Sequence, residues 1–133
     1  MQTYLLLGVL LFSAGTLLGI PHGLSKRRGS PAVTELWHVA HLSTCVGGIS
    51  LIALTLALEQ LFPGQEYLVM MPFTTAAYLF FGACTLSGLV GRGWDNDRTM
   101  PSVRVIYWMQ IVASVASVVA VLSFIILALG LGR

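Results

Sequence analysis

The chain has 133 residues, of which 56% are hydrophobic and 9% carry a charge, and its mean hydropathy is +0.87. Soluble domains carry a charge on about a quarter of their residues, so this chain has too few charges to cover a water-facing surface. The composition therefore predicts an integral membrane protein and excludes soluble enzymes and nucleic-acid-binding modules. At about 20 residues per spanning helix, the length allows four spans and no extramembrane domain.

Four apolar runs predict an all-α membrane four-helix bundle that forms one domain, with spans at about 3–20, 31–58, 67–90 and 102–130. The first run ends at Pro21-His22-Gly23, and we expect a retained span because no cleavage site precedes the basic cluster that follows. Ser30 and Pro31 have the N-cap and first-turn preferences of a helix start. Gly91 is expected to stop the third helix.

The basic residues gather at two of the three loops. Six of the seven lie in or beside the first and third loops: Lys26, Arg27, Arg28, Arg92, Arg98 and Arg104. The second loop has Glu59 and Glu66 and no basic residue. The positive-inside rule therefore places the first and third loops in the cytoplasm and both termini on the non-cytoplasmic side.

Small residues recur inside the spans. Gly15 and Gly19 are four residues apart and share one helix face, which allows another helix to approach closely. Ordinary packing within the bundle explains this spacing, and contact between copies of the chain is the alternative.

All three histidines lie in one stretch, with His22 after the first span and His38 and His41 in the second. An imidazole inside a membrane helix is costly unless it faces the bundle interior and has a partner or a role. His38, His41, Cys45 and Gly48 share a helix face through their spacing of three and four residues. This face is predicted to form one wall of a cofactor pocket.

The depth of each histidine in the membrane ranks the three as candidate metal ligands. At 1.5 Å per residue, His38 lies about 12 Å and His41 about 16 Å along the second helix, so His41 is the predicted metal ligand. A helix–helix hydrogen bond is the alternative for His41, and an interfacial position is the alternative for His38 and His22. Imidazole suits zinc, copper and haem iron, and one deep histidine among glycines and aliphatic residues favours haem.

Any haem is expected to be non-covalent, because the chain has no Cys-x-x-Cys-His motif. Four cations near the interface are candidates to bind its propionates: Lys26, Arg27, Arg28 and Arg104.

The third span contains one prominent polar group, Tyr78. It lies about 20 Å from the cytoplasmic end of that helix, a depth similar to that of His41. A buried phenol needs a hydrogen-bond partner. Two interpretations stay open: a hydrogen bond to a neighbouring helix, and a proton donor or substrate anchor that faces the His41 pocket.

Two short motifs resemble the styrene oxide isomerase family of small, four-span bacterial membrane enzymes that bind haem b. They are Trp37-His38-Val39-Ala40-His41, which leads into Gly47-Gly48, and Tyr78-Leu79-Phe80. The resemblance implies that His41 is the axial haem ligand and that Tyr78 is catalytic. It also implies a trimer in the bacterial cytoplasmic membrane.

The chain departs from that family at Gly47, where the family has an active-site asparagine. Glycine has no side chain to bind an epoxide oxygen. Thr44, Ser43 and Tyr78 are the candidates to replace it, and Thr44 and Tyr78 are the predicted catalytic residues.

The resemblance implies an isomerase in which ferric haem acts as a Lewis acid. A small apolar epoxide would arrive from the lipid and open to a carbonyl product. The sequence leaves two other classes open. One is a non-enzymatic haem protein (an electron carrier, sensor or haem chaperone) with His22 or His38 as a second axial ligand. The other is a transporter, a metal-binding protein or a structural subunit without haem.

Overall fold

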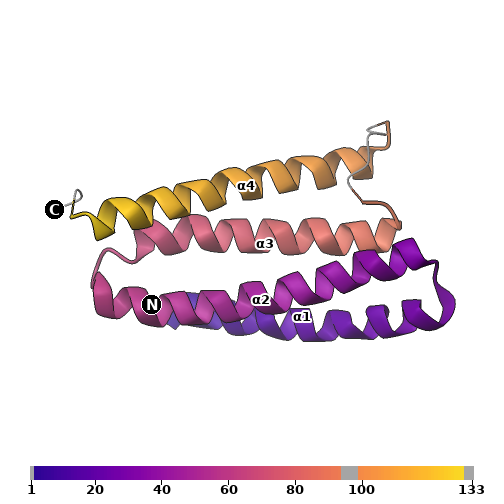
Figure 1. Ribbon diagram of the computed structural model, residues 1–133, viewed down its shortest axis with the longest axis horizontal. Helices are drawn as coiled ribbons and strands as arrows, with labels where there is room; N and C mark the ends of the chain where they lie inside the picture. The colour runs from indigo at the N-terminus through magenta and orange to yellow at the C-terminus, as the bar shows by residue number, and fades with distance from the viewer. Residues whose placement is uncertain (1, 94–98, 131–133) are drawn as a thin grey trace.

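The computed structural model describes residues 2–93 and 99–130, which form four helices and no strand. The helices are α1 (Gln2–Arg28), α2 (Pro31–Leu61), α3 (Tyr67–Val90) and α4 (Pro101–Ala128). All four are long and apolar enough to cross a membrane, which confirms the predicted all-helical, four-span fold. Figure 1 shows the chain reversing at each loop, so that both termini and the α2–α3 loop lie at one end.

The prediction that the first helix ends at Pro21-His22-Gly23 is wrong, because α1 continues to Arg28. Proline removes one backbone donor, and membrane helices tolerate this loss. The added turns lie beside the start of α2, where the ring of His22 contacts that of His38. The Ser25 hydroxyl is buried and donates to the carbonyl of His22 at 2.8 Å. The extension therefore makes His22 part of α1 and not part of a loop.

The other helix ends follow local sequence signals. Ser30 caps α2, and its side chain accepts a hydrogen bond from the backbone N–H of Val33 at 3.4 Å. Gly91 ends α3 in the left-handed conformation, with φ of 68°, which glycine adopts at little cost. The bounds of α3 agree with the predicted 67–90, whereas α2 runs three residues beyond the predicted 58 and α4 ends two residues before 130.

Helices α1 and α2 pack with almost no space between their backbones. A Cβ built at Gly15 would lie 2.7 Å from the backbone nitrogen of Cys45, closer than real Cβ atoms approach. Gly15 therefore serves close packing within the chain, as the first of the two interpretations predicted. Gly19 plays a different part, because its Cβ would lie 3.4 Å from the His41 ring.

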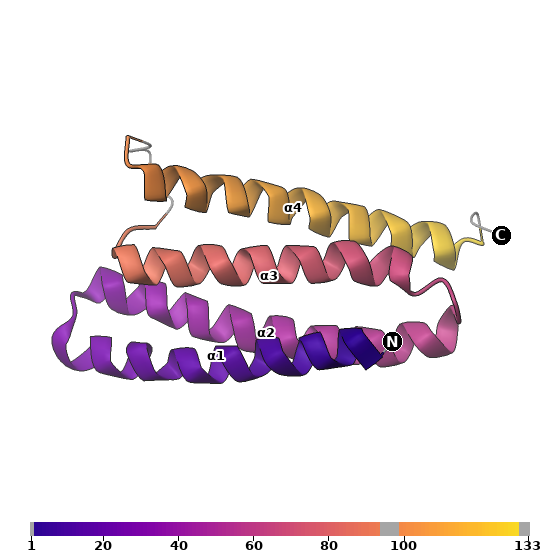
Figure 2. The same ribbon diagram turned by 180° about the vertical axis from the view of Figure 1, so that it is seen from behind.

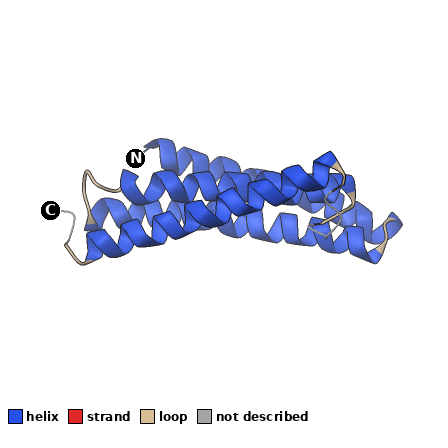
Figure 3. Cartoon of the chain, turned by 90° about the horizontal axis from the view of Figure 1, so that it is seen from above, coloured by secondary structure: helices blue, strands red, loops and turns tan. Residues whose placement is uncertain are grey.

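The bundle is open on the side of α4. Helix α3 lies between α4 and the α1–α2 pair (Figures 1 and 2). In the described ranges, no Cα of α4 comes within 8 Å of a Cα of α1 or α2. Short loops join α1 to α2 and α2 to α3 (Figure 3). Side chains of α2 and α4 therefore line the same space over α3, although the backbones of these two helices do not pack against each other.

The described basic residues of the two loops lie at one end of the bundle. Lys26, Arg27 and Arg28 end α1, Arg92 follows α3, and Arg104 is in the first turn of α4. Arg98 lies outside the described residues. The orientation of this end toward the cytoplasm stays a prediction from the positive-inside rule.

We expect the Gly15→Ala substitution to destabilise the α1–α2 pair by about 1–3 kcal/mol, because overpacking forces the backbones apart. Gly23→Ala is the matched control on the same helix, since a Cβ there meets nothing within 4 Å, and it is expected to be neutral or to stabilise by about 0.5–1 kcal/mol. Thermal unfolding in detergent measures both. Equal stability of the two variants would contradict the packing described here.

Candidate functional site

The central group of the site is the imidazole of His41 on α2. Its Nδ1 lies 2.7 Å from the carbonyl oxygen of Gly15 on α1. A carbonyl oxygen only accepts hydrogen bonds, so Nδ1 must carry the proton and Nε2 keeps its lone pair. Metal-binding histidines are commonly held in this way, with the second ring nitrogen donating to a carbonyl. The half-buried His41 side chain is therefore oriented, and its tautomer fixed, by the neighbouring helix.

Three other predicted residues gather around His41. The His22 ring lies 6.1 Å from the His41 ring and 5.0 Å from the His38 ring, between centroids. The Sγ of Cys45 is 3.9 Å from His41 Nδ1. In residues 2–93 and 99–130, no three His, Cys, Asp or Glu side chains are arranged to hold a metal ion. The described histidines are therefore not arranged as a three-histidine site for a bare ion.

Gly48 and Gly19 have roles in the structure other than the predicted ones. The sequence predicts Gly48 in the wall of the cofactor pocket. In the structure, Gly48 is buried against the backbone of Phe12 on α1. Its role in this fold is close helix packing. Gly19 leaves the space in which the His41 ring lies, because a Cβ there would touch the ring.

The structure does not bring Tyr78 to His41. The Tyr78 hydroxyl donates to the carbonyl of Leu7 at 2.8 Å, whereas His41 bonds to Gly15. Leu7 and Gly15 are eight residues apart on α1, about 12 Å along its axis. Of the two interpretations, the hydrogen bond to a neighbouring helix is present in the single chain, and the role of Tyr78 as a proton donor or substrate anchor stays a prediction.

Thr44 follows His41 by three residues, about one turn further along α2. Its side chain is 2% exposed and lines a cavity of about 400 Å³ between α2, α3 and α4, which we call the inner cleft. Ser43 and Gly47 line the same cavity from α2. Phe73, Phe80 and Phe81 contribute from α3, and Ala113, Ser114 and Ser117 from α4.

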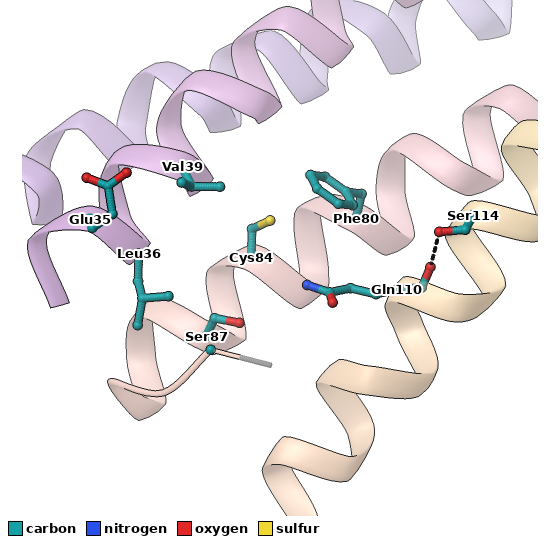
Figure 4. A pocket seen from close by; sticks show the side chains of 9 residues that line it. Glu35, Leu36, Val39, Phe80, Cys84, Ser87, Gln110 and Ser114 are labelled. Carbon is teal, nitrogen blue, oxygen red and sulfur yellow. Dashed lines mark hydrogen bonds between the residues drawn. The ribbon is translucent and has the colours of Figure 1, made fainter. Parts of the chain in front are cut away.

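A second cavity of about 360 Å³ continues toward the basic end of the bundle, and we call it the loop-end cleft (Figure 4). Glu35 lies at its α2 side, and the Gln110 side chain extends from α4 toward Cys84 and Ser87 of α3. Phe80 and Ser114 line both cavities. The two cavities are therefore neighbours over α3 and share these two wall residues.

Sequence reasoning missed the α4 side of these two cavities. Gln110, Ser114 and Ser117 follow one another at spacings of four and three residues, so they share one face of an otherwise apolar helix. This polar stripe is the sequence signal for the α4 side of the two cavities, because it predicts that this face of α4 contacts other helices as well as lipid.

Comparison with known protein families identifies the family of this chain. The family model described as styrene oxide isomerase matches residues 1–130, nearly the whole chain. The chain belongs to the styrene oxide isomerase family. Membership confirms the resemblance seen in the motifs around His41 and Tyr78, and it indicates an isomerase of the styrene oxide type. No curated protein and no solved structure matches the chain.

We expect His41 in this member of the styrene oxide isomerase family to be protonated at Nδ1 and not at Nε2 when no metal is bound. Imidazole ¹⁵N NMR on the His22→Gln/His38→Gln double variant, which retains one histidine, measures the tautomer. A proton on Nε2 alone would contradict the hydrogen bond to Gly15.

We expect Tyr78→Phe to lower the free energy of unfolding by about 1 kcal/mol, because the hydrogen bond between α3 and α1 is lost. Thermal unfolding and kcat are measured on the same preparation. A fall in kcat without a change in stability would instead support the catalytic role that the family resemblance implies for Tyr78.

Proposed function

We propose that this chain is a haem b-dependent isomerase that converts a small apolar epoxide into a carbonyl compound. The observation that carries the proposal is the 2.7 Å contact between His41 Nδ1 and the Gly15 carbonyl. It leaves Nε2 as a free lone pair at the position where the family resemblance implies the axial ligand. Membership of the styrene oxide isomerase family supplies the reaction class.

The residues around His41 fit a haem group. The ring nitrogen that would bind iron is unprotonated, and the carbonyl of Gly15 acts as its second-sphere partner. Lys26, Arg27 and Arg28 are exposed at the end of the same helix α1, where they are candidates to bind the propionates. When bound, ferric haem supplies a Lewis acid that polarises the epoxide oxygen.

The chain itself must bind the epoxide and orient its oxygen. Many large apolar side chains are exposed on all four helices, so an apolar substrate can reach the protein through the lipid. The family asparagine falls on Gly47, which lines the inner cleft next to Thr44. Thr44 is one helical turn from that position, so its hydroxyl is the nearest replacement on this face of α2. The structure thus favours Thr44 over Tyr78 as the group that orients the oxygen.

A homo-oligomer, with a trimer implied by the family resemblance, is part of the proposal. The His41 ring is only half-buried between α1 and α2. A haem bound to its Nε2 would therefore have a large apolar face to cover, and a second copy of the chain or the lipid would cover it. The exposed apolar side chains of α1 and α4 are suited to either contact.

A non-enzymatic haem protein is the second candidate, and one observation favours it. The His22 ring lies 6.1 Å from the His41 ring and 5.0 Å from the His38 ring, between centroids, so further imidazoles are at hand to supply a second axial ligand. A six-coordinate iron would have no free position for substrate. The two functions therefore differ in the coordination number of the iron, which the absorption spectrum reports.

We expect the purified protein to show a Soret band with a high-spin, five-coordinate ferric spectrum, and the His41→Ala variant to lose the band. Isomerisation of styrene oxide should fall by more than the 10–100-fold that loss of a second-sphere partner costs in metal sites, about two decades or more. His38→Gln is the matched control, because His38 is exposed on the same helix and should leave both properties unchanged.

A low-spin spectrum in the wild type that becomes high-spin in His38→Gln or His22→Gln would favour the non-enzymatic function. Absence of a Soret band after expression with added haem would overturn both haem functions.

A further inference from the structure

His22 and His38 form a pair of imidazoles near the end of the bundle that carries the basic residues. His22 lies six residues before the last residue of α1, and His38 lies seven residues after the first residue of α2, which is about 9 Å and 10 Å along the two helices. The two ring centroids are 5.0 Å apart. Ionisable side chains in membrane helices pair with one another and mark functional sites, so this contact calls for an explanation.

Neither ring of the pair is held by the protein in the way that His41 is. The His41 imidazole bonds to the carbonyl of Gly15, whereas no hydrogen bond or ion pair joins the imidazole of His22 or His38 to a described residue. A neutral imidazole carries one proton and keeps a lone pair on its other nitrogen. The pair therefore presents two lone pairs near each other, with no donor among the described residues to occupy them.

The spacing of the two rings fits coordination of one ion. Imidazole nitrogens bind Zn²⁺ at about 2.0–2.1 Å in tetrahedral sites, which places the centroids of two coordinating rings about 5.2 Å apart. The separation of 5.0 Å between His22 and His38 is close to this value. The separation of 6.1 Å between His22 and His41 is longer, and one nitrogen of His41 is already bonded to Gly15. The geometry therefore selects His38 as the partner of His22.

The surroundings of the pair allow water to complete the coordination. His38 is exposed and His22 is half-buried, so water at the membrane surface can reach an ion between them. The neighbouring charges have opposite signs, because Glu35 lies one turn before His38 and Lys26 one turn after His22, and both are exposed. No three His, Cys, Asp or Glu side chains of the described residues are arranged around an ion. The available ligands are therefore two imidazoles and water.

We propose that His22 and His38 bind one divalent transition-metal ion of the type that imidazole prefers, such as Zn²⁺, with water as the other ligands. The ion joins the last turns of α1 to the first turns of α2 and clamps the two helices at this end. The extension of α1 beyond Pro21, which brings His22 beside His38, thereby acquires a role. The site is separate from the haem proposed at His41 and does not rest on the proposed function.

The experiment measures zinc binding to the full chain in lipid nanodiscs. The protein is purified without a polyhistidine tag, and EDTA removes loosely bound ions but leaves a bound haem in place. Zn²⁺ is then titrated by isothermal calorimetry, with empty nanodiscs as the blank. Zn K-edge X-ray absorption of the loaded protein counts the imidazole ligands, and thermal unfolding is followed with and without Zn²⁺.

Four variants test the assignment. His22→Gln and His38→Gln each remove one proposed ligand. Lys26→Gln is the matched control, because it introduces the same residue one turn from His22 and keeps both imidazoles. His41→Ala tests whether the predicted haem ligand takes part.

We expect the wild type to bind one Zn²⁺ per chain through two imidazoles at about 2.0–2.1 Å. His22→Gln and His38→Gln should each bind at least 10-fold more weakly, because loss of even a second-sphere partner costs a metal site about 10–100-fold. His41→Ala should bind as the wild type does. Lys26→Gln should bind equally or up to about 5-fold more tightly, because it removes one exposed repelling charge.

Zn²⁺ should raise the Tm of the wild type, because the ion binds the folded helix pair, and should leave the Tm of His22→Gln and of His38→Gln unchanged. Mg²⁺ should not compete with Zn²⁺, because Mg²⁺ takes oxygen ligands. Displacement of Zn²⁺ by an equal concentration of Mg²⁺ would contradict coordination by imidazole.

Wild-type affinity in either His22→Gln or His38→Gln would overturn the proposal, because an ion between the helices needs both rings. Absence of zinc binding to the wild type would also overturn it. So would loss of binding in His41→Ala, or binding in that variant alone, because the site would then not be separate from the haem ligand. If zinc binds as expected but the Soret band or the isomerase activity is missing, only the proposed function is wrong.

Discussion

The close approach of α1 to α2 at Gly15 is the constraint on which the rest of the site depends. Because Gly15 has no side chain, its backbone reaches that of α2 near Cys45. The same approach brings the Gly15 carbonyl within 2.7 Å of His41 Nδ1. One glycine thus packs two helices and fixes the tautomer of the predicted ligand. A membrane bundle relies on such packing because lipid provides no hydrophobic force between helices.

The hydroxyl of Thr44, one turn after His41 on α2, lacks among the described residues the partner that many other helical hydroxyls have. Many helical hydroxyls donate to their own backbone, and those of Ser43, Thr55 and Ser87 do so. Those of Thr44, Thr74 and Thr85 are buried without a partner among the described residues. Thr44 is unpaired in the wall of a groove that aromatic side chains line. One helix therefore carries, one turn apart, an oriented imidazole that bonds to α1 and an unpaired hydroxyl in the cleft toward α3 and α4.

Gly47 connects these observations to the family. The styrene oxide isomerase resemblance places an asparagine there, and this chain has no side chain at that position. In the fold, Gly47 lines the inner cleft beside Thr44, so the position belongs to the cleft face and not to the His41–Gly15 contact. In the function proposed here, glycine in place of asparagine leaves more room in the cleft, and the hydroxyl of Thr44, one turn earlier, takes over the hydrogen bond to the epoxide oxygen.

The sequence by itself determined the membrane class, the four helices, the cap at Ser30 and the stop at Gly91, because composition and local backbone preferences act over a few residues. It also placed His38, His41 and Cys45 on one face, since that depends only on helical periodicity. It misplaced the end of α1, because packing against α2 outweighs the local effect of Pro21. Only the tertiary structure decided which carbonyl orients His41, that Tyr78 bonds to Leu7, and that Thr44 lies in a groove with α4. Each of these depends on how helices far apart in the chain are rotated and offset against one another, which helical periodicity does not specify.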